Sequence, residues 1–290
     1  MDSCFLLCFQ NDVASGRGGS VINVNEILHR MIAEFQRIEQ VTAIAMVGSK
    51  FCNYQNDLSD ISINVYYTAP ISKEMRSEIL TKFSNDIELS GTDIVETDCF
   101  QLRDFCIEMT ICYFCFEEIE NKLIQLMKDA VINQKNSTKV AYFVHYSNII
   151  FDRHEKLNQL KQDYTSSYPD ELRRNIVQIN YPKLKKESKC YYHQFERALS
   201  RRDFPHLISL LNDYLTIYID SIFALNKQFN PVEKRVLQVM DETCPIVPKM
   251  LKENIELLFV YASRCDKHLL QVLSIMMNQL DHLLKKEELV

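Results

Sequence analysis

Gly48 and Ser49 follow an apolar run in a pattern that suits phosphate binding. The run from Val41 to Val47 is short, continuously apolar and rich in β-branched residues, as is typical of a buried strand. A Gly-Ser pair at a strand-to-helix junction lets backbone N–H groups approach an anionic phosphate, helped by the helix dipole. We therefore interpret Gly48 and Ser49 as phosphate-binding residues.

An acidic residue, separated from Ser49 by ten residues, stands at the start of a second predicted strand. Asp60 precedes residues 61–67, which alternate between apolar and polar side chains as a half-buried strand does. Positions 60 and 62 project from the same face of such a strand, because side chains repeat every two residues. Paired acids there would hold Mg²⁺ against the phosphates of a nucleotide, and a third carboxylate from a neighbouring strand would allow two metals and in-line displacement.

This order of residues resembles the nucleotidyltransferase superfamily, whose pattern is Gly-Ser, a spacer and then Asp-x-Asp/Glu. The third acid of that superfamily lies on a later strand, and here Glu108 fits that place within residues 107–111. The resemblance implies that Asp60 and Glu108 are catalytic and bind Mg²⁺, or Mn²⁺ in its place. It also implies that Ser62 lies at the nucleotide, and that the nucleotide is a nucleoside triphosphate, with ATP expected first.

Three segments of the second half sharpen the resemblance. They look like a bacterial family of nucleotidyltransferase-like proteins, known mainly as a domain of unknown function and related to small antibiotic nucleotidyltransferases with a helical C-terminal domain. The resemblance covers roughly residues 25–285 and implies that Lys234 faces the nucleotide between the domains; an exposed helix cation is the alternative. The segments are Tyr168 to Asn175, Tyr192 to Ala198 and Phe223 to Arg235.

Two positions depart from the superfamily pattern. Ser62 stands where a second acid is expected, which removes one negative charge beside a dication, although a hydroxyl ligates Mg²⁺ weakly. Glu108 stands where aspartate is usual, which keeps the charge and lengthens the reach. Asp57 and Asp104 are candidates for a compensating acid, although Asp57 precedes the strand and Asp104 is expected in a loop.

The periodicity along the chain predicts an α+β fold: a mixed sheet with flanking helices, as in nucleotidyltransferases, followed by an all-helical bundle. We expect a flexible lead-in over residues 1–22, a nucleotidyltransferase-like domain over 23–165 and the helical bundle over 166–290. Strands are expected at residues 41–47, 61–67, 94–102 as part of a hairpin, 105–114 and 140–151. Helices are expected near residues 23–35, 72–83, 116–131, 152–163, 170–180, 185–200, 204–228, 231–241 and 248–284.

Side chains in the helical half have mainly structural interpretations. A stripe of apolar residues from Phe204 to Ile222 predicts bundle core. Arg173 and Arg174 are expected to pair with Asp170 and Glu171 in their own helix. His193 is expected to pack between helices, with contact to a nucleotide as the alternative.

Composition narrows the class of protein. The 290 residues are 47% hydrophobic and 25% charged, as in a soluble folded chain, and the net charge of -6 does not favour nucleic acid as a partner. The ten cysteines are scattered through apolar runs, where free cysteine behaves as a small hydrophobe. The start lacks a basic segment typical of secretion signals, and no apolar run reaches the length of a membrane span. We expect a cytoplasmic protein without a membrane partner, with a homodimer left open.

Two functions from different classes fit these observations. The first is an enzyme that moves a nucleoside monophosphate from the triphosphate to a hydroxyl of a small molecule or a protein; neither the nucleotide nor the acceptor can be read from the sequence. The second is a catalytically impaired protein that binds a nucleotide or a partner, because Ser62 replaces a metal ligand. A third idea, the antitoxin half of a toxin pair, is disfavoured by the attached helical domain.

Overall fold

The computed structural model describes residues 24–47, 60–91, 96–103, 105, 107–132, 138–186, 190–232 and 235–290. By contacts the chain forms two compact units, which we name the sheet unit (residues 1–120 and 146–160) and the helical unit (residues 121–145 and 161–290). The predicted division into residues 23–165 and 166–290 stays a prediction; in the structure residues 121–145 group with the helices. The predicted lead-in over residues 1–22 lies outside the described residues.

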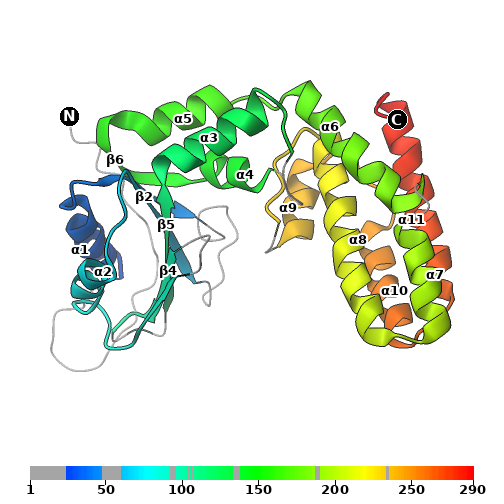
Figure 1. Ribbon diagram of the computed structural model, residues 1–290, viewed down its shortest axis with the longest axis horizontal. Helices are drawn as coiled ribbons and strands as arrows, with labels where there is room; N and C mark the ends of the chain where they lie inside the picture. The colour runs from blue at the N-terminus through cyan, green and yellow to red at the C-terminus, as the bar shows by residue number, and fades with distance from the viewer. Residues whose placement is uncertain are drawn as a thin grey trace. The chain divides into compact units, whose positions relative to one another are not determined.

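The sheet unit is built on a six-stranded mixed sheet with the order β3-β4-β5-β2-β1-β6. β2 and β5 run parallel, whereas the other neighbouring strands pair antiparallel. This sheet and the helices that follow confirm the predicted α+β class (Figure 1). The strands are β1 (Val41–Val47), β2 (Ile61–Tyr67), β3 (Ile87–Gly91), β4 (Glu96–Gln101), β5 (Glu108–Cys115) and β6 (Asn148–Asp152).

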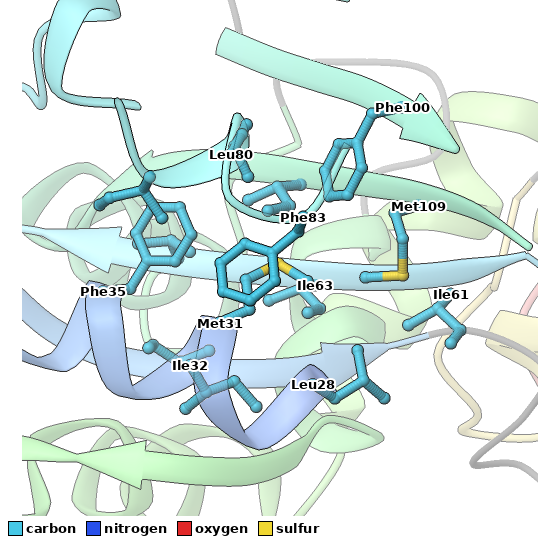
Figure 2. Packing of buried hydrophobic residues seen from close by; sticks show 14 of the residues in the cluster. Leu28, Met31, Ile32, Phe35, Ile61, Ile63, Leu80, Phe83, Phe100 and Met109 are labelled. Carbon is cyan, nitrogen blue, oxygen red and sulfur yellow. The ribbon is translucent and has the colours of Figure 1, made fainter. Parts of the chain in front are cut away.

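Helix α1 (Val24–Gln36) covers one face of the sheet and forms its main core. Leu28, Met31, Ile32 and Phe35 recur at helical spacing and are buried against the strands (Figure 2). The side chains of Ile61 and Met109 reach the same core from β2 and β5. Because side chains alternate between the two faces along a strand, the neighbours of these buried residues in β2 and β5 point to the opposite face.

Helix α2 (Lys73–Leu80) packs beside α1 and begins where the sequence predicts. The hydroxyl of Ser72 accepts a hydrogen bond from the backbone N–H of Met75, which satisfies one of the unpaired donors of the first turn. Leu80 at its C-terminal end lies in the same core as α1.

Two predictions for the sheet unit and its neighbour need correction. Residues 140–151 were expected to form one strand, but helix α4 (Lys139–His145) precedes β6 there. Ala141 and Val144 are buried three residues apart, which is helical spacing that a short apolar run conceals. The hairpin expected at residues 94–102 begins earlier, because β3 pairs with β4.

The helical unit contains the long buried helix α8 (Phe204–Leu225) among shorter helices. By length and composition alone α8 could span a membrane, but 61% of its most apolar window is buried inside the unit, as in the core helix of a soluble protein. The predicted core stripe is confirmed except at Phe204, which is exposed at the first turn. The remaining helical elements of the two units are α3 (Phe116–Met127), η1 (Arg153–Glu155), α5 (Lys156–Thr165), α6 (Asp170–Tyr181), η2 (Pro182–Lys186), α7 (Tyr191–Arg201), α9 (Val236–Thr243), α10 (Leu251–Ser263) and α11 (His268–Lys286). Of these, η1 lies in the sheet unit, and α3 and α5 have residues in both.

A buried ion cluster ties α2 to the sheet. The Arg76 side chain is fully buried; its Nη1 donates to Glu96 Oε2 at 2.8 Å, and its Nε lies 3.6 Å from Asp98 Oδ2. Its guanidinium also lies over the ring of Tyr113, 4.6 Å from the centroid. Burial raises the pKa of Asp98 against the opposing effects of Tyr113 and Arg76. Arg76 and Asp98 are both fully buried, so neither of these two opposite charges can be hydrated.

Removing Arg76 alone should destabilise the protein strongly. We expect Arg76→Leu to lower the free energy of unfolding by about 3–5 kcal/mol at pH 7, because Asp98 would be left buried without its cation. The double variant Arg76→Leu/Asp98→Leu should recover most of that loss, since uncharged side chains need no partner. Urea unfolding measures both, with Arg37→Leu as a surface control that costs about 0–1 kcal/mol. A double variant no more stable than Arg76→Leu would contradict this account.

Candidate functional site

The parallel pairing of β2 with β5 brings two predicted site residues together. Ile61 pairs with Met109, so Asp60 and Glu108 occupy equivalent positions one residue earlier, at the same end of neighbouring strands. Such strands lie about 4.8 Å apart. The two residues therefore occupy neighbouring positions at one edge of the sheet. Their role as metal ligands stays a prediction.

Both residues project from the face opposite the apolar core. Ile61 and Met109 are 1% exposed, whereas Asp60 and Glu108 are exposed, which is the alternation of a strand with one dry face. Ser62 is half-buried on this second face, two residues after Asp60. The predicted shared face of Asp60 and Ser62 follows from this pattern.

The second face carries rows of polar side chains across three strands, which we name the polar face. Ser62 pairs with Thr110 on β5, and Thr110 pairs with Cys99 on β4, with Cys99 Sγ and Thr110 Oγ1 3.9 Å apart. In the row at the sheet edge, Gln101 on β4 pairs with Glu108. The polar face is thus acidic and exposed at its edge and neutral and half-buried further in.

The next row inward closes this face. Asn64 is 4% exposed, and its amide lies 3.5 Å from the hydroxyl oxygen of Tyr66. Burial raises the pKa of Tyr66 to about 12, while the hydrogen bond with Asn64 opposes the shift. On β4 the hydroxyl of Thr97 contacts Cys112 Sγ at 3.8 Å. This inner row of the polar face is therefore made of uncharged hydrogen-bonding groups.

The donor set at the sheet edge suits a hard divalent cation. Mg²⁺ takes oxygen ligands and is commonly held by one or two carboxylates together with substrate phosphates. Asp60 and Glu108 supply two carboxylates, and Ser62 supplies a hydroxyl on the same face. Among the described residues no three His, Cys, Asp or Glu side chains gather as a metal cluster. Two carboxylates and a hydroxyl are the kind of donor set that holds Mg²⁺ together with a phosphorylated substrate.

Several predicted site positions are not described. Gly48 and Ser49, the predicted phosphate loop, lie outside the described residues, as do Lys234 and the candidate acids Asp57 and Asp104. Their predicted roles stay predictions. Sequence reasoning missed Gln101 and Thr110, because only the strand register shows that they share a face with the acids. Alternation along residues 96–101 was the available signal.

In the helical unit several polar residues of the segments quoted above hold helix ends together. Arg173 donates through Nη2 to the carbonyl of Leu225 and to Glu287 Oε2, both at 2.9 Å, and so does not form the predicted pair within its own helix. Asp170 instead pairs with Lys227 at 2.9 Å. The predictions for these side chains were wrong because distant helix ends compete for them.

His193 also departs from its prediction. It is exposed on α7, and its Nδ1 lies 2.8 Å from Glu196 Oε2 one turn later. The side chain therefore contacts its own helix and does not pack between helices. Contact with a nucleotide stays untested.

A buried carboxylate joins several elements of the helical unit. Asn180 and Asn230 each donate an amide hydrogen bond to Asp220 at 3.1 Å, and the backbone N–H of Asn230 donates to Thr138 Oγ1 at 2.8 Å. Burial raises the pKa of Asp220, while the two amide hydrogen bonds lower it. Asp220 is thus the centre of a network that connects α6, α8, the segment after α8 and the start of α4.

Comparisons with known proteins bear on the second half of the chain. Residues 134–235 match a family model described as a domain of unknown function (DUF4037), which covers all three segments quoted above. The predicted resemblance to a family known as a domain of unknown function is confirmed for these residues, which are fewer than half of the chain. The relation to antibiotic nucleotidyltransferases stays a prediction.

The chain also matches solved structures, among them the following one. It is the crystal structure of a nucleotidyltransferase-like protein from Exiguobacterium sibiricum, with 12% identity and a TM-score of 0.42, over 91% of this chain and 76% of that one. No curated protein matches the sequence.

Neutralising one site carboxylate should stabilise the protein. Like charges on facing strand positions destabilise a sheet, so we expect Glu108→Gln to raise the free energy of unfolding by about 0.2–1 kcal/mol in the absence of divalent metal. Urea unfolding in chelator at low salt measures the change. Glu88→Gln on β3 is the matched control, because Glu88 pairs with Cys99 and not with an acid. Equal effects of the two substitutions would argue against facing carboxylates.

Asp220 should make stability fall as pH rises above about 4. An unfolded aspartate has a pKa of about 3.9, so between that pH and the raised folded pKa the folded state holds more protons, and stability decreases with pH. The unfolding free energy of the wild type minus that of Asp220→Asn should therefore decrease from pH 4 upward, which urea titrations at several pH values measure.

Asp170→Asn is the control of opposite sign. Lys227 lowers the pKa of Asp170. The unfolding free energy of the wild type minus that of Asp170→Asn should therefore grow as pH rises through the low folded pKa towards the unfolded value. Parallel curves for the two variants would contradict the assignment of Asp220.

Proposed function

We propose that this protein is a metal-dependent nucleotidyltransferase that moves a nucleoside monophosphate from a nucleoside triphosphate to a hydroxyl group of a small molecule or a protein. The parallel pairing of β2 with β5 carries this proposal, because it puts Asp60 and Glu108 side by side on the polar face. The order Gly48-Ser49, spacer and Asp60 supports the nucleotide as the ligand, with ATP as the first candidate.

The proposed reaction is an in-line displacement at the α-phosphorus. A new bond forms between the acceptor oxygen and the phosphorus, the bond to the β-phosphate oxygen breaks, and pyrophosphate leaves. A bound Mg²⁺ would offset the negative charge of the phosphates during this exchange. Asp60 would hold that metal, while Glu108 would assist it or accept the proton of the acceptor hydroxyl. Positioning and electrostatics would supply most of the rate.

The helical unit and the predicted phosphate loop have the remaining roles in the proposal. Lys234 would bind a phosphate of the nucleotide, and the helices would select the acceptor, since acceptor sites are shaped by packing and not by a motif. Gly48 and Ser49 would hold the phosphates through backbone N–H groups. A cytoplasmic location fits a protein that uses a soluble triphosphate.

A second candidate function rests on Ser62. The described site offers two carboxylates where the superfamily pattern expects three, and a hydroxyl is a weaker ligand than a carboxylate. A protein of this kind would bind a nucleotide or a protein partner without turning the nucleotide over. Catalysis and binding alone differ in one observable, the metal-dependent release of pyrophosphate.

Pyrophosphate release from ATP with Mg²⁺, measured with and without candidate acceptors, separates the two functions. We expect turnover by the natural protein, and a loss of about a hundredfold or more in Asp60→Ala, because the metal would lose a carboxylate ligand. Asp86→Ala, which removes an exposed acid elsewhere in the sheet unit, should keep wild-type turnover.

Ser62→Asp gives the opposite test. If the natural protein is inactive and Ser62→Asp creates turnover, the chain has lost catalysis through this one position, and the enzyme proposal fails. Nucleotide binding without turnover in both proteins would also favour the second candidate.

A further inference from the structure

Gln101 occupies the third position of the row that contains the two site carboxylates. β4 pairs antiparallel with β5, and Gln101 lies opposite Glu108. β2 pairs with β5 on the other side, where Asp60 lies beside Glu108 by the register of the neighbouring pair. Glu108 is therefore flanked by Asp60 on one strand and Gln101 on the other.

The side chain of Gln101 belongs to the polar face. Phe100 is 6% exposed and packs in the apolar core, so the residues on either side of it point away from that core (Figure 2). Cys99, two residues before Gln101, contacts Thr110 on this face. The side chain of Gln101 is exposed, and within the described part of the chain its side-chain amide makes no hydrogen bond.

Strand spacing puts all three side chains within reach of one ion. Strands lie about 4.8 Å apart, so an ion above Glu108 is one strand spacing from Asp60 and from Gln101. Glutamine has a longer side chain than serine, and its carbonyl oxygen is an established ligand of hard cations. Ser62 lies one row further from the sheet edge, with a short side chain.

Charge also favours a neutral third ligand. Asp60 and Glu108 together already carry two negative charges, which balance a divalent ion before any phosphate arrives. An amide oxygen adds coordination without adding repulsion toward the phosphates. A carboxylate at position 101 would bind the free metal more tightly than the natural amide.

We propose that the Oε1 atom of Gln101 is the third protein ligand of the divalent metal, in place of the acid that is missing at Ser62. This inference rests on the proposed function, because it assumes that Asp60 and Glu108 hold a metal. The metal site is then Asp60, Glu108 and Gln101, one residue from each of three adjacent strands.

Binding of Mn²⁺ alone to the full-length protein, followed by the electron paramagnetic resonance signal of free Mn²⁺, tests the proposal without any turnover. We expect Gln101→Ala to raise the dissociation constant about tenfold or more and Gln101→Glu to lower it about tenfold. Gln178→Ala is the matched control, since Gln178 is exposed on α6 in the helical unit and should leave the affinity unchanged. Circular dichroism establishes that each variant is folded, and Gln101→Glu keeps the test decisive if the alanine variant is not.

The variants of the two carboxylates separate the two levels of the proposal. If Asp60→Ala and Glu108→Ala abolish Mn²⁺ binding while both Gln101 variants bind as wild type does, Gln101 is not a ligand and the proposed function survives. If the wild type does not bind Mn²⁺, or Asp60→Ala and Glu108→Ala keep its affinity, the metal site itself is wrong and both proposals fall.

Discussion

The parallel pairing of β2 with β5 is the interaction on which the architecture of the site depends. It is the one parallel contact in the described sheet, and it joins strands that are separated in sequence by α2, β3 and β4. Parallel neighbours need such a crossover, and they bring equivalent strand ends to the same edge. The pairing of Ile61 with Met109 sets the register, and a shift of one residue would turn Asp60 or Glu108 into the core.

That register is stabilised because one face of the sheet is apolar and the other is polar at the strand ends that carry the site. On one face the apolar side chains of β2 and β5 meet α1 in a core from which water is excluded. On the other face the same strands carry exposed carboxylates at the sheet edge and half-buried hydroxyls in the next row. The buried Arg76 and Asp98 add a further constraint, because their charges are compensated only in this arrangement of α2 and β4.

The helical unit shows how polar residues specify packing between helices. Asp220 accepts hydrogen bonds from Asn180 and Asn230, and Arg173 binds the carbonyl at the end of α8. These bonds connect segments that are distant in sequence, and they lie within the residues that match the domain of unknown function. Such buried networks help define a unique arrangement when every member is satisfied. The polar residues of this network therefore have a structural role that does not require contact with a ligand.

The sequence by itself determined the local elements and part of the site. The strands at residues 41–47 and 61–67 and the cap at Ser72 follow from alternation and from side-chain chemistry, both of which are local. Asp60 could be selected because it stands at the start of an alternating run, and Glu108 because the superfamily resemblance implies an acid within a later strand. Only the tertiary structure decided that the two are neighbours, that Gln101 joins their row and that Arg173 leaves its own helix. Those facts depend on strand order and on helix ends that meet across the fold, and periodicity within one segment carries no information about which distant segment will be its neighbour.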